Sequence, residues 1–176
     1  MFTTKEQVIA LLTELGARLV EQGLEAELYI VGGAAMLLGY DKRAVTGDID
    51  ALITPIGVIE EVAAQMASDR RDLQPNWLNS QVAALLPRIA DSRSWEMFSA
   101  PGISVEIASP EHLLAMKVRA GRGLRDLQDV GVLCEILELD EVAQVWEICD
   151  QVWGKNFIRP EVVSAVTEFL LSRGLH

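Results

Sequence analysis

The chain has 176 residues, half of them hydrophobic, and a formal net charge of −11 at pH 7. This length suits one domain, or one compact domain with a helical appendage, and the acidity argues against broad electrostatic attraction to nucleic acid. No apolar run approaches the roughly eighteen residues of a membrane span, and the first residues, MFTTKEQ, do not resemble a signal peptide, so we expect a cytoplasmic protein without membrane contact.

The first part of the chain alternates helical and strand patterns. Thr3 and Thr4, with Glu6 and Gln7 three positions further on, predict a capping box at the start of an amphipathic helix that ends near Gly23. Short apolar segments next to turn residues predict buried strands, and apolar positions at helical spacing predict further helices. The predicted strands are 26–31 and 48–54, and the predicted helices are 34–39, 57–68 and 77–86.

The second part begins with a predicted hairpin and continues as helices. The segments SWEMFSA and GISVEIA predict two strands around a turn at Pro101 and Gly102. Ser109 and Pro110 are typical of an N-cap and a first helical position. Helices are predicted at 110–121, 125–138, about 141–153 and 160–172. This order favours an α/β or α+β fold, with a mixed sheet backed by helices and a C-terminal helical segment.

Three carboxylates are candidate metal ligands. Side chains alternate along a strand, so Asp48 and Asp50 share a face of the predicted strand 48–54. Glu106 lies on the polar face of the later strand, and it would become a third ligand if the two strands were neighbours. Three oxygen donors suit Mg²⁺ or Mn²⁺. In the alternative, Glu106 only faces solvent from an edge strand.

Candidate phosphate ligands precede these carboxylates. Gly32 and Gly33 follow a strand and open a short helix, where backbone N–H groups can bind an anion such as a triphosphate. Arg43 and Thr46 either bind substrate phosphate or only cap and solvate the loop.

Lys117 lies in the middle of the apolar face of the predicted helix 110–121, and Asp126 faces inward from the next helix. An inward lysine needs a counter-charge, so the two side chains either form a structural ion pair or border the phosphates and metal. His112 is expected on the polar face, which makes a histidine base a poor candidate. The segment KVRAGRGLR, 117–125, is a local basic strip that could contact RNA phosphates.

Taken together, the motifs resemble the nucleotidyltransferase superfamily that includes DNA polymerase beta. The matching residues are Gly32, Gly33, Asp48 and Asp50 in VGGAAMLLGYDKRAVTGDIDALI, and Glu106 in ISVEIASPEHLLAMK. The segments RAVTGDID, WLN and SPEHLLAMKVRAGRGLRDLQDVGVL look like a small bacterial branch of uncharacterised members related to toxin and antitoxin components. The likeness spans about residues 26–137.

This resemblance implies transfer of a nucleotide from a nucleoside triphosphate, with Mg²⁺ or Mn²⁺, to a hydroxyl of an RNA such as tRNA or of a protein. Gly32 and Gly33 would bind the phosphates, and Asp48, Asp50 and Glu106 the metals. Lys117 with Asp126 would match charged helix positions of toxin-related members, and a cognate toxin or antitoxin partner is implied. The family more often has Gly-Ser and a third Asp, where this chain has Gly33 and Glu106.

The resemblance also implies a nucleotidyltransferase-like domain over residues 1–137, with a helical extension, 138–176, packed on it. Two other interpretations stay open at this point. One is a catalytically inactive binding protein on the same fold, antitoxin-like or regulatory, because fold alone does not determine activity. The other is a helical regulatory domain whose acids coincide with the motif by chance.

Overall fold

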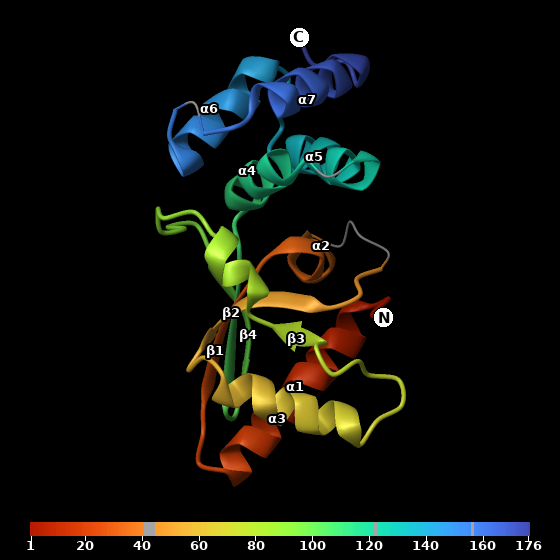
Figure 1. Ribbon diagram of the computed structural model, residues 1–176, viewed down its shortest axis with the longest axis vertical. Coiled ribbons are helices and arrows are strands. Elements are labelled where there is room, and N and C mark those ends of the chain that lie inside the picture. The colour runs from red at the N-terminus through yellow and green to blue at the C-terminus, as the bar shows by residue number, and fades with distance from the viewer. Residues whose placement is uncertain (41–44, 122, 156) are drawn as a thin grey trace. The chain divides into compact units, whose positions relative to one another are not determined.

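The computed structural model describes residues 1–40, 45–121, 123–155 and 157–176 (Figure 1). The chain forms two compact units, which we call the sheet unit (residues 1–85 and 93–108) and the helical unit (residues 86–92 and 109–176). The helices from residue 110 to residue 136 therefore belong to the same unit as the C-terminal helices. The domain boundary expected at residue 137 stays a prediction.

The sheet unit contains a mixed five-stranded sheet in the order β3, β2, β1, β5, β4. Its strands are β1 (Ala26–Ile30), β2 (Ile49–Thr54), β3 (Leu78–Asn79), β4 (Trp95–Ala100) and β5 (Ile103–Ile107). Its helices are α1 (Lys5–Glu21), α2 (Gly32–Tyr40), α3 (Val58–Ser68) and the 3₁₀ helix η1 (Gln81–Leu85). The central strand β1 pairs antiparallel with β2 and parallel with β5. A mixed sheet backed by helices confirms the predicted α+β class.

One face of this sheet is buried against helices. The inward side chains of β1, β2 and β5 alternate with outward ones, as predicted for β2 and β5, and the inward set is fully apolar. Gly16 of α1 packs so closely against β5 that a Cβ added to it would lie 2.8 Å from Cγ2 of Ile103. Gly39 of α2 packs in the same way against Ile107. The opposite face carries exposed side chains such as Glu27, Leu52 and Glu106.

The predicted N-terminal helix is confirmed with its cap. Thr4 is the N-cap of α1, its hydroxyl accepts a hydrogen bond from the Gln7 backbone N–H, and the Gln7 side chain accepts in return from the Thr4 backbone. The predicted helix 77–86 is helical only over Gln81–Leu85, as the 3₁₀ helix η1. Leu78 and Asn79 form β3 beside β2, and the Asn79 side chain accepts from the Gln81 backbone N–H, which favours a turn over a continuous helix.

The helical unit consists of α4 (Pro110–Ala120), α5 (Leu124–Ile136), α6 (Val142–Trp153) and α7 (Pro160–Ser172). Ser109 is the N-cap of α4, and Pro110 is its first residue, as predicted. Cys134 and Cys149 are free and buried in this unit. Among the described residues of both units, no helix is both long enough and apolar enough to cross a membrane.

Candidate functional site

The loop before β2 positions the two candidate aspartates. Asp48 and Asp50 flank the fully buried Ile49, and both are half-buried. Thr46 fixes this loop: its backbone N–H and carbonyl pair with those of Phe2, and its hydroxyl donates to the Asp48 carbonyl oxygen at 3.0 Å. Thr46 is itself buried, so of its two predicted roles the structure shows the capping one. The other candidate in this stretch, Arg43, lies outside the described residues.

Gly32 is the point where helix α2 begins beside Asp50. Its φ of +66° lies in the left-handed region, which lets the chain turn directly from β1 into the helix. A Cβ added at Gly32 would lie 3.4 Å from Asp50 Oδ2, so the start of the helix lies close to that carboxylate. Gly33 follows as a helical residue, and both glycines are half-exposed. The partial positive charge of a helix N-terminus favours an anion at this place.

Asn79 lies next to Asp50 across the strand pair. The two residues are partners in the parallel register of β2 and β3, so their side chains share a face of the sheet. Asn79 is buried, and its Oδ1 accepts the hydrogen bond from Gln81. The sequence placed this asparagine in a helix and so gave no signal for its position beside Asp50.

Glu106 shares the open face of the sheet with Asp50 but is separated from it by a strand. In the register, Glu106 of β5 pairs with Tyr29 of β1, which in turn pairs with Leu52 of β2. The two acidic strands are therefore not neighbours, so the condition under which Glu106 would become a third ligand is not met. Two strand spacings amount to about 10 Å, which exceeds the ligand shell of one metal ion. Glu106 is exposed and accepts a hydrogen bond from the Ser94 hydroxyl at 3.1 Å.

The metal assignment rests on the two aspartates. Across residues 1–40, 45–121, 123–155 and 157–176, no three His, Cys, Asp or Glu side chains are grouped closely enough to hold a metal ion. Asp48 and Asp50 are half-buried hard oxygen donors on either side of Ile49, which suits Mg²⁺ or Mn²⁺ bound by two carboxylates together with substrate phosphates. These two residues fit such an ion, whereas the role predicted for Glu106 stays a prediction.

Lys117 and Asp126, both in the helical unit, form the predicted ion pair. Lys117 Nζ lies 3.0 Å from Asp126 Oδ1 and 2.8 Å from Asp129 Oδ2, and the three side chains are only 13%, 15% and 11% exposed. The second partner, Asp129, was missed, although it lies three residues after Asp126 on the same helix face. This geometry shows the structural role of Lys117, and its role beside the phosphates stays a prediction.

His112 is buried, which corrects the expectation that it lies on a polar face. Its Nδ1 lies 3.3 Å from Asp91 Oδ1, and its Nε2 lies 3.3 Å from the Ile89 carbonyl oxygen. The other oxygen of Asp91 accepts from the Ser109 backbone N–H at 2.8 Å. Segment 86–92 therefore packs against the start of α4, and because this contact is distant in sequence, no local pattern pointed to it.

The chain matches no family model, and neither a curated protein nor a solved structure matches it. The likeness to nucleotidyltransferases consequently rests on the sequence motifs quoted above alone.

Proposed function

We propose that the protein is a metal-dependent nucleotidyltransferase that moves a nucleotide from a nucleoside triphosphate to a hydroxyl of an RNA or protein acceptor. The observation that carries this proposal is the position of Gly32. The first turn of α2, which favours phosphate, begins at a residue whose added Cβ would lie 3.4 Å from Oδ2 of Asp50, which favours a cation. A triphosphate bound with a divalent ion requires both kinds of group side by side.

In this proposal, each residue has a defined task. The first backbone amides of α2, at Gly32 and Gly33, bind phosphate oxygens, and the lack of side chains lets the phosphates approach closely. Asp48 and Asp50 hold Mg²⁺ or Mn²⁺. The ion, when bound, neutralises charge on the phosphates and on the departing oxygens. Thr46 keeps the Asp48 loop in place through its hydrogen bond to the Asp48 carbonyl.

One observation favours a second candidate, a binding protein that uses this fold without catalysis. Glu106 lies two strands away from Asp50, so the third carboxylate of the resemblance is not beside the other two. The N-terminus of α2 also supplies positive potential close to Asp50, which lowers the need for a bound cation there. A protein of this kind would bind its partner without transferring a nucleotide.

The proposal is tested by thermal melting with each nucleoside triphosphate, with and without Mg²⁺ or Mn²⁺. A ligand at a hundred times its dissociation constant stabilises the native state by about 2.7 kcal/mol, which for a chain of this size raises Tm by roughly 5–10 °C. We expect one triphosphate to give a shift that depends on the metal and that disappears in the double variant Asp48→Asn/Asp50→Asn.

The matched control is Glu27→Gln/Glu96→Gln, which removes two exposed carboxylates from the same sheet and leaves the aspartates intact. This control should keep the shift. No shift with any triphosphate, or an equal shift in the aspartate variant, would contradict the proposal. A shift without transfer of the labelled α-phosphate to RNA or protein would favour the binding protein instead.

A further inference from the structure

Two basic segments of this acidic chain belong to the helical unit, and Arg119 of the first contacts Trp153 and Phe157 of the second. Residues 117–125 contain Lys117, Arg119, Arg122 and Arg125, and residues 153–159 contain Lys155 and Arg159, with no carboxylate in either segment. The chain as a whole has 26 acidic and 15 basic residues. These two segments are therefore basic, although the chain as a whole is acidic.

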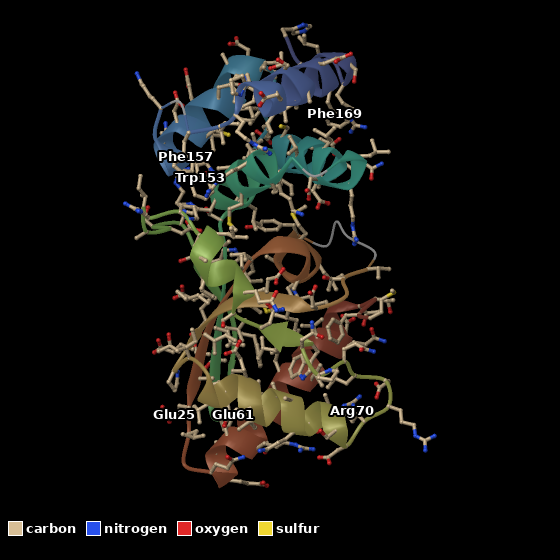
Figure 2. All side chains as sticks on the ribbon, in the orientation of Figure 1. Glu25, Glu61, Arg70, Trp153, Phe157 and Phe169 are labelled. Carbon is tan, nitrogen blue, oxygen red and sulfur yellow. The ribbon has the colours of Figure 1, made fainter. Side chains whose placement is uncertain are left out.

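The contact between the two segments is a cluster of one cation and two aromatic rings. The Arg119 guanidinium carbon lies 4.2 Å from the centroid of the Trp153 ring and 4.6 Å from that of Phe157. The two rings are stacked, with centroids 5.4 Å apart and planes inclined by 4°. Figure 2 labels Trp153, at the end of α6, and Phe157, which follows it. We call Arg119, Trp153 and Phe157 the aromatic cluster.

The aromatic cluster is anchored on one side and exposed on the other. Trp153 Nε1 donates to the Ala115 carbonyl oxygen at 2.9 Å, which fixes the indole against α4. Phe157 is 50% exposed despite its stack with Trp153. A guanidinium that stacks on a ring face directs its N–H groups outward in its own plane, where they can still donate to an anion.

Two exposed cations lie next to this cluster in the sequence. Lys155 and Arg159 flank Phe157 and are both exposed, whereas Lys117 is paired with Asp126 and Asp129 and does not contribute. Exposed aromatic rings among Arg and Lys side chains form the combination that binds unpaired nucleic acid, because bases stack on the rings and phosphates pair with the cations. The net charge opposes this binding only weakly at close range, since salt screens charges beyond about 10 Å at 0.1 M.

We propose that the aromatic cluster and the exposed cations Lys155 and Arg159 form a binding site for single-stranded nucleic acid. The site does not depend on the nucleotidyl transfer proposed above, because it lies wholly in the helical unit and its test measures binding alone. A base would stack on Phe157, and the neighbouring phosphates would contact the cations.

The test is fluorescence anisotropy of the full chain with labelled single-stranded RNA and DNA oligonucleotides of one sequence and with the corresponding duplex. We expect a dissociation constant between about 1 and 100 μM at about 0.1 M salt, with weaker binding of the duplex. The dissociation constants for RNA and for DNA are measured separately. Tighter binding of RNA would indicate contacts to the 2′-hydroxyl. Each cation that contacts phosphate contributes about −0.7 to the slope of log K against log salt.

Two variants of the proposed site are compared with two matched controls. The controls show whether a loss of binding comes from the site or from the change in charge or side-chain size alone. Phe157→Ala should raise the dissociation constant about tenfold, and Arg159→Gln should make the salt slope less steep by about 0.7. Leu171→Ala and Arg173→Gln make similar changes elsewhere on the helical unit, at exposed positions near the end of α7, and should leave binding unchanged. Absence of saturable binding, duplex binding as tight as single-strand binding, or variants that behave like their controls would overturn the proposal.

Discussion

Lys117 offers the sharpest test of the structural reasoning, because its charge lies between two carboxylates in the interior of the helical unit. We predict that Lys117→Met strongly destabilises the protein. Methionine has a similar length and fits an apolar helix face, so the substitution mainly removes the charge. It leaves Asp126 and Asp129, which are only 15% and 11% exposed, without their shared cation.

The expected magnitude follows from the distances and the burial. At an effective dielectric constant of about 20, contacts of 3.0 and 2.8 Å each contribute roughly 6 kcal/mol of attraction before the cost of desolvation is subtracted. Since desolvation offsets much of this attraction, the net loss on removing one partner of a buried pair is about 3–5 kcal/mol. The triple variant Lys117→Met/Asp126→Asn/Asp129→Asn should recover most of this loss, because no uncompensated charge then remains.

The assay is urea unfolding followed by circular dichroism at 222 nm. Arg173→Met is the matched control, because Arg173 lies 2.8 Å from Glu135, but the side chains are 50% and 60% exposed. An exposed pair contributes about 0–1 kcal/mol, so this control should change the free energy of unfolding little. A loss for Lys117→Met no larger than that of the control, or a triple variant less stable than the single one, would refute the reasoning.

Three further predictions concern the turn, the thiols and the cap. Gly102→Ala should lower Tm far more than Gly23→Ala. Both residues have positive φ, but only at Gly102 would the added Cβ clash with a backbone oxygen, that of Gly16. Equal losses of Tm in the two variants would contradict this prediction. Burial raises the pKa of the Cys149 thiol from 9.0 to about 12, so the neutral thiol is favoured in the native state. Its contribution to stability should be complete below about pH 9 and lost as the pH rises towards 12, and the thiol should react with a disulfide reagent at pH 8 only after unfolding. Ser109→Ala removes the N-cap acceptor of α4 and should cost about 1 kcal/mol in urea unfolding, whereas no measurable loss would show that this cap is dispensable.

The sequence by itself determined most of the elements, because these depend on interactions between residues close in the chain. The capping box at Thr4 and Gln7 is built from neighbours three residues apart, and the N-cap at Ser109 followed by Pro110 is equally local. The alternation of apolar and polar residues likewise predicted which face of β2 and of β5 is buried. The helical period placed Lys117 and Asp126 on inward faces, and the structure shows that they form an ion pair.

Only the tertiary structure decided which of these elements are neighbours. The insertion of β1 between β2 and β5 separates Glu106 from Asp50, and the pairing of Asn79 with β2 replaces the start of a predicted helix by a strand. The burial of His112 depends on Asp91, which reaches it from a segment about twenty residues earlier in the chain. Strand order and such contacts result from the packing of the whole unit, which minimises exposed apolar surface over all elements at once. Strand order and contacts between distant residues therefore cannot be predicted from local periodicity.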